Sequence, residues 1–63
     1  MIAGDIIRPE CPDWFEDYGY AEVVHIADGN ITIQWVSNGN FETYELTEVT
    51  CWMIKAENVQ LNK

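Results

Sequence analysis

The fold is decided by residues 20–46, which read YAEVVHIADGNITIQWVSNGNFETYEL. Two short turn signals, Asp-Gly-Asn at residues 28–30 and Ser-Asn-Gly-Asn at residues 37–40, divide this stretch into three runs rich in β-branched and aromatic residues. Such turns between such runs are the strongest short-range signal of consecutive β-hairpins, because Gly, Asn and Asp tolerate positive φ. The stretch therefore predicts three antiparallel strands in succession.

The run at residues 31–36 alternates cleanly between two faces. Ile31, Ile33 and Trp35 share one face, and the positions between them form the other. Side chains alternate across a strand with a period of two, so we expect these three residues to lie in the core.

The preceding run, residues 20–27, alternates less cleanly. Ala21, Val23 and Ile26 point to the same side only if a β-bulge lies near residues 24–25. Bulges are common where a small barrel turns a corner, so a bulge is predicted there.

The segments before this meander predict one more strand and a loop. Residues 4–9 resemble a strand that proline terminates, and we expect it at an edge or end of the sheet because proline cannot donate to the ladder. Residues 10–19 contain four acids and three aromatics with neither the strand nor the helix period, which predicts a long first loop over one end of the barrel.

The C-terminal segment carries two competing patterns. Val49, Trp52, Met53 and Ala56 fit a helical stripe, whereas residues 50–54 are rich in strand-forming types. We favour a turn at 47–50 followed by a strand at 51–55, with the helix left open. A final short strand containing Val59 and Leu61 would then pair with the first strand.

Length and charge limit the functions that the chain can have. Its 63 residues make a single domain, residues 1–63, with 48% hydrophobic residues and a net charge of −8. Its three basic residues, Arg8, Lys55 and Lys63, are far apart, whereas binding a phosphate backbone needs clustered Lys and Arg. Direct nucleic-acid binding is therefore not expected, and a basic partner surface is favoured.

No pattern in the sequence indicates catalysis, a cofactor, a metal or a membrane. His25 is the single histidine, and the acids of the first loop lack the order of a calcium loop, so we expect a protein that is not an enzyme and holds no metal. No basic and apolar leader and no long apolar run is present, so a cytoplasmic protein without membrane contact is expected.

The two cysteines, Cys11 and Cys51, allow two states. A disulfide between them would close a long loop and contribute about 4 kcal/mol on the chain-entropy model. In a reducing compartment we expect free thiols instead, one in a loop and one packed.

Taken together, these segments predict an all-β fold, a small SH3-like antiparallel barrel of five to six short strands with one long first loop. The segments GDIIRP, GYAEVVHI, ITIQW and SNGNFETYELTEV, within residues 4–49, resemble the SH3-like small barrels of the Tudor, KOW and chromo group. In size, acidity and layout the chain is also similar to short stand-alone barrels encoded by tailed bacteriophages. Asn38 stands where the Tudor turn carries an aromatic residue.

The resemblance implies a binding function. Tudor and related domains hold a methylated Lys or Arg, or an unmodified basic peptide, among aromatic rings at one end of the barrel, and cation–π attraction contributes about 0.5–2 kcal/mol per contact. The candidate anchors here are aromatic residues in or near the first loop and the second turn, and the candidate steering charges are acids of the first loop. The predicted partner-binding residues are Trp14, Phe15, Tyr18, Tyr20, Phe41, Asp13, Glu16 and Asp17.

Two functions follow as expectations. The first is an acidic protein-interaction module that binds a basic segment or surface of a partner through this aromatic and acidic patch. The alternative is a DNA-mimic inhibitor, which would present carboxylates in the place of phosphates to a nucleic-acid-binding protein. Exposed sheet edges on so short a barrel allow either a monomer or a dimer.

Overall fold

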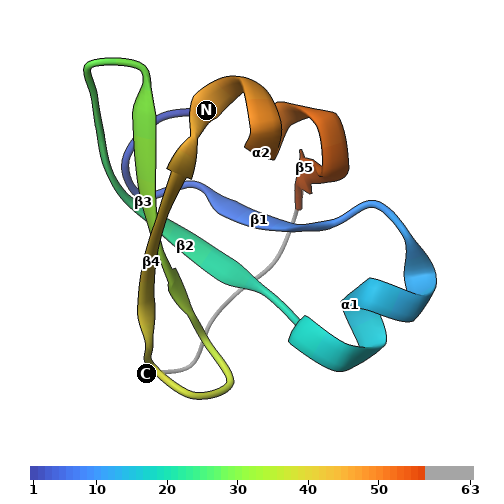
Figure 1. Ribbon diagram of the computed structural model, residues 1–63. Helices are drawn as coiled ribbons and strands as arrows, with labels where there is room; N and C mark the ends of the chain where they lie inside the picture. Colours follow the sequence, from blue (N-terminus) through green and yellow to red (C-terminus); the bar gives the residue numbers. More distant parts are fainter. Residues whose placement is uncertain (57–63) are drawn as a thin grey trace.

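The structure, a computed structural model, describes residues 1–56 and shows a small all-β fold of five antiparallel strands with two short helices (Figure 1). The elements are β1 (Ile6–Pro9), α1 (Pro12–Tyr18), β2 (Ala21–Ala27), β3 (Asn30–Trp35), β4 (Phe41–Glu45), α2 (Leu46–Trp52) and β5 (Met53–Lys55). The last strand predicted from the sequence, with Val59 and Leu61, lies outside the described residues.

The strands form one sheet in the order β4-β3-β2-β1-β5, which is compatible with an SH3-like small β fold. Because β1 pairs with β2 on one side and with β5 on the other, the prediction that it is an edge strand was wrong. Pro9 is tolerated there because it is the last residue of β1, where a missing donor costs only a terminal ladder bond.

The central meander is confirmed. The register between β2 and β3 shifts between Val23 and His25, which is the predicted bulge. The tight turn that joins the two strands places Asp28 at φ 55° and Gly29 at φ 77°, and residues with positive φ are what this turn requires.

The predicted long loop at residues 10–19 was wrong, because most of it forms α1. Pro12 stands at the first helical position, where its missing N–H is no loss, and Gly19, at φ 74°, ends the helix with its N–H donating to the carbonyl of Phe15. The helical spacing places Trp14 and Tyr18 one turn apart on the same face.

The turn and strand predicted at residues 47–55 were also wrong in part, because the helical alternative holds up to Trp52 and only Met53–Lys55 is a strand. Tertiary packing overrides the β-propensity of this segment: the helix buries Val49 completely, and Met53 follows it into the core at 2% exposure. Cys51, predicted as the packed cysteine, is exposed on this helix.

The core contains the residues that the alternation predicts. Ile31, Ile33 and Trp35 are 0%, 0% and 4% exposed, so their prediction as core residues is confirmed. One face of the sheet and helix α2 contribute to this cluster. Its buried members are Ile7, Ala21, Val23, Ile31, Ile33, Trp35, Val49 and Met53.

Candidate functional site

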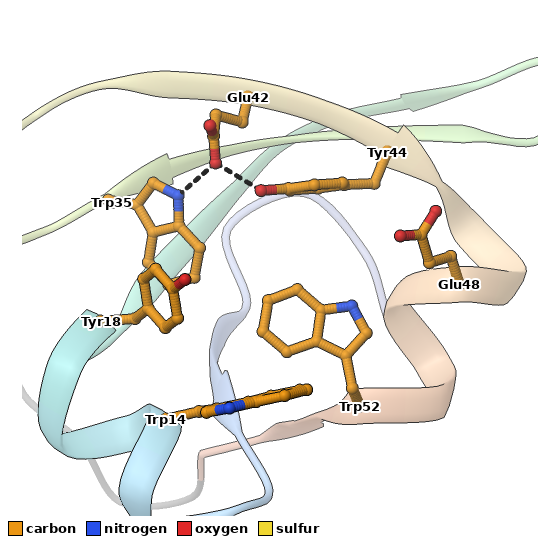
Figure 2. Close-up of a pocket in the computed structure, with 7 residues that line it drawn as sticks. All are labelled: Trp14, Tyr18, Trp35, Glu42, Tyr44, Glu48 and Trp52. Carbon is orange, nitrogen blue, oxygen red and sulfur yellow. Dashed lines mark hydrogen bonds between the residues drawn. The ribbon is translucent and has the colours of Figure 1, made fainter.

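An aromatic pocket of about 400 Å³ opens where α1 and α2 approach β3 and β4 (Figure 2). Five aromatic rings and two carboxylates surround it, and none of the lining residues is basic. The lining residues are Trp14, Tyr18, Trp35, Glu42, Tyr44, Glu48 and Trp52.

The two helices supply one side of this aromatic pocket. Trp14 and Tyr18 come from successive turns of α1, and Trp52 comes from the last residue of α2. The Trp14 and Trp52 rings meet edge to face, with centroids 5.6 Å apart and planes at 81°. The ring centroid of Trp52 also lies 6.5 Å from that of Tyr18 and 6.1 Å from that of Tyr44. Trp52 therefore packs near rings from both α1 and β4.

Trp35 lines the pocket from the end of β3. It is the last residue of β3 and is 4% exposed, yet its ring stacks on Tyr18 with centroids 5.3 Å apart and planes at 28° (Figure 2). Its second role is polar, because the indole Nε1 donates a hydrogen bond of 2.8 Å to Oε2 of Glu42 on the neighbouring strand. Trp35 therefore belongs to both the core and the pocket.

Glu42 is held by two donors. Besides the indole of Trp35, the hydroxyl of Tyr44 donates to the same oxygen of Glu42 (Figure 2). These bonds, first the one from Tyr44 and then the one from Trp35, lower the pKa of the Glu42 carboxyl below its ordinary value. Glu42 therefore keeps its negative charge to a lower pH than an ordinary glutamate does.

Burial, followed by the hydrogen bond to Glu42 and the charge of that carboxylate, raises the pKa of Tyr44 to about 12. Because this value lies above the ordinary 10.0, the stability that Tyr44 contributes is fully present below pH 10 and is lost as the pH rises through about 12. We expect phenolate absorbance to show one late-titrating tyrosine that Tyr44→Phe removes. A late component that persists in this variant would contradict the assignment.

The structure distributes the predicted site residues over several surfaces. Trp14 and Tyr18 line the aromatic pocket. Phe15 instead packs edge to face on Tyr20, with centroids 5.0 Å apart, and the Arg8 guanidinium lies 5.2 Å from the Phe15 centroid. Phe41 is 60% exposed at the start of β4 and does not line the pocket.

The predicted acids lie around the pocket and not in it. Asp17 lines a smaller hollow of about 140 Å³ that includes Asn38 of the second turn. This hollow shares Tyr18, Trp35 and Glu42 with the aromatic pocket. Asp13 and Glu16 are exposed on α1 outside both hollows.

Sequence reasoning missed most of the aromatic pocket. Trp35 was assigned to the core. The remaining residues come from β4, of which only Phe41 was predicted as a site residue, and from α2, of which none was. The residues found only in the structure are Glu42, Tyr44, Glu48 and Trp52. The helical spacing of Val49, Trp52 and Met53 was the one signal in the sequence that could have indicated the position of Trp52.

Within residues 1–56, no three His, Cys, Asp or Glu side chains come together as a metal site requires. No helix in that part of the chain is long and apolar enough to cross a membrane. The fold and the site together define a small all-β domain with an anionic aromatic pocket. No protein-family model, curated protein or solved structure matches the chain.

Proposed function

We propose that this protein is an interaction module that binds a cationic side chain from a basic segment of a partner protein in the aromatic pocket. The observation that supports the proposal is the convergence of five aromatic rings and two carboxylates on one hollow. A ring face attracts a cation by about 0.5–2 kcal/mol, more as the cation loses water, and several rings around one hollow add their attraction.

The charges of the molecule favour the same ligand. Glu42 and Glu48 line the pocket, whereas the basic groups of residues 1–56 are engaged elsewhere: Arg8 over Phe15, and Lys55 at 3.5 Å from Asp5. Within residues 1–56, no Lys or Arg side chain therefore neutralises the two pocket carboxylates. The net charge of −8 would also speed encounter with a basic partner.

This function agrees with what the resemblance to Tudor-type barrels implies. The likeness to short stand-alone bacteriophage barrels rests on size, acidity and layout, and we propose that the chain is a member of that kind. This chain differs from the Tudor pattern in where one aromatic ring comes from. The turn that contains Asn38 contributes no ring to the pocket, whereas α2 contributes the ring of Trp52.

The intrinsic fluorescence of the protein gives a direct test, because all three tryptophans of the chain line the aromatic pocket. Short peptides with one central Lys, Arg or N-methylated Lys would be titrated, alongside matched peptides with neutral norleucine or citrulline. We expect saturable quenching by the cationic peptides, at least about tenfold weaker binding of the neutral ones, and weakening by salt. The methylated series would show which ammonium group the rings prefer.

Equal binding of the charged and neutral peptides would refute a cation site. A basic nucleic-acid-binding protein that is captured equally well when the pocket residues are changed would instead favour the DNA-mimic alternative.

A further inference from the structure

The two cysteines lie beside a backbone contact that joins β1 to the end of α2. The β1–β5 ladder ends with Pro9 opposite Met53. One residue further along each segment, the N–H of Glu10 donates a hydrogen bond of 2.8 Å to the carbonyl of Trp52. This single bond joins the end of β1 to the last residue of α2.

Cys11 and Cys51 are the next residue on each segment. Both are free and exposed, and both line one hollow of about 320 Å³ together with Trp14 and Trp52. A disulfide needs Cα atoms about 4.4–6.8 Å apart. The hydrogen bond between Glu10 and Trp52 holds the two segments beside each other one residue away from both thiols. From this backbone contact and the shared hollow we propose that Cys11 and Cys51 form a reversible intramolecular disulfide.

The reaction is a thiol–disulfide exchange with a small disulfide as oxidant. The thiolate of one cysteine attacks a sulfur of the small disulfide and expels one small thiolate, which leaves a mixed disulfide on the protein. The second cysteine attacks the protein sulfur of that bond and expels the other small thiolate. Two protein thiols are oxidised, one small disulfide is reduced to two thiols, and the protein thiol protons go to solvent or to the departing thiolates.

The bond would link the residue before α1 to the last turn of α2. Trp14 follows Cys11 by three residues and Trp52 follows Cys51 directly, so the link restrains the two helices whose rings meet at the aromatic pocket. Figure 1 shows α1 and α2 on the same side of β4. The disulfide itself does not depend on the proposed binding function.

The test uses the full chain, reduced and then exposed to 2-hydroxyethyl disulfide, a neutral oxidant that the charge of −8 does not repel. We expect a monomer whose mass falls by two hydrogen atoms, with loss of both maleimide-reactive thiols and full recovery on reduction. The urea midpoint of the oxidised form should lie above that of the reduced form.

Cys11→Ser and Cys51→Ser serve as matched variants, because each leaves one thiol and the fold can be checked by circular dichroism. Each should gain one hydroxyethylthiol group and keep it. Wild-type protein that retains two such groups, or that forms disulfide-linked dimers at a rate proportional to its concentration, would overturn the proposal. Since mass and thiol count are read without any ligand, failure here is distinct from failure of the cation site.

Discussion

Trp14→Ala is expected to weaken the binding of a Lys- or Arg-containing peptide by about 5- to 30-fold and to leave the sheet folded. Trp14 forms one wall of the aromatic pocket against Trp52, and the loss of one cation–π wall costs about 1–2 kcal/mol. Its side chain is 49% exposed and lies outside the buried core, so its removal opens no cavity there. Fluorescence titration of the remaining tryptophans measures the change.

Phe41→Ala is the matched control for this experiment. Phe41 is an aromatic residue with 60% exposure that does not line the aromatic pocket, so its loss should change affinity less than twofold. Equal losses in the two variants would mean that the peptide binds through general surface hydrophobicity. An unchanged affinity in Trp14→Ala would remove the aromatic pocket as the binding site.

Glu48→Gln would separate the contribution of pocket charge to peptide affinity from the contribution of the aromatic rings. Glu48 lines the aromatic pocket from the first turn of α2. An exposed charge acts over the Debye length and is screened by salt, so this variant should bind more weakly at low salt and approach the wild type at high salt. The salt dependence of Trp14→Ala should remain that of the wild type.

The sequence was sufficient for the parts of the fold that local chemistry determines. The Asp-Gly and Asn-Gly turns, the alternation through Ile31, Ile33 and Trp35, and the bulge at Val23–His25 all follow from residues close together in the chain. The helices could not be read in the same way, because seven residues give fewer than two turns of periodicity. Pro12 and Gly19 mark the two ends of α1. Proline and glycine are also typical of turns and loops, so their presence alone does not indicate a helix.

The aromatic pocket could be predicted only in part, because it depends on contacts between distant segments. Trp14 and Tyr18 were recognised as aromatics in a polar stretch. Their pairing with Trp52 and Tyr44 requires α2 to fold back beside β4, which no local pattern specifies. The role of Trp35 in the pocket could not be predicted either. Alternation identifies which face of a strand is buried, but it does not show that the indole Nε1 of Trp35 donates a hydrogen bond to Glu42.

Ile33→Ala is expected to remove about 2–5 kcal/mol from the free energy of unfolding, because Ile33 is fully buried at the centre of β3. At about 0.05–0.15 kcal/mol per residue, a domain of 63 residues has about 3–9 kcal/mol in total. This one truncation should therefore remove a large share of the stability or unfold the chain outright. Urea denaturation followed by tryptophan fluorescence measures it, since Trp35 leaves the core when the sheet opens.

Two further substitutions test whether the cost comes from the core. Ile33→Val removes a single methylene group and should cost about 0.5–1.5 kcal/mol, which gives a graded series at one position. Val36→Ala changes a β-branched residue just beyond β3 that is 48% exposed, and it should cost less than about 0.5 kcal/mol. If Val36→Ala proved as costly as Ile33→Ala, the two faces of this strand would not differ in burial, and the placement of Ile31, Ile33 and Trp35 at the centre of the sheet would be wrong.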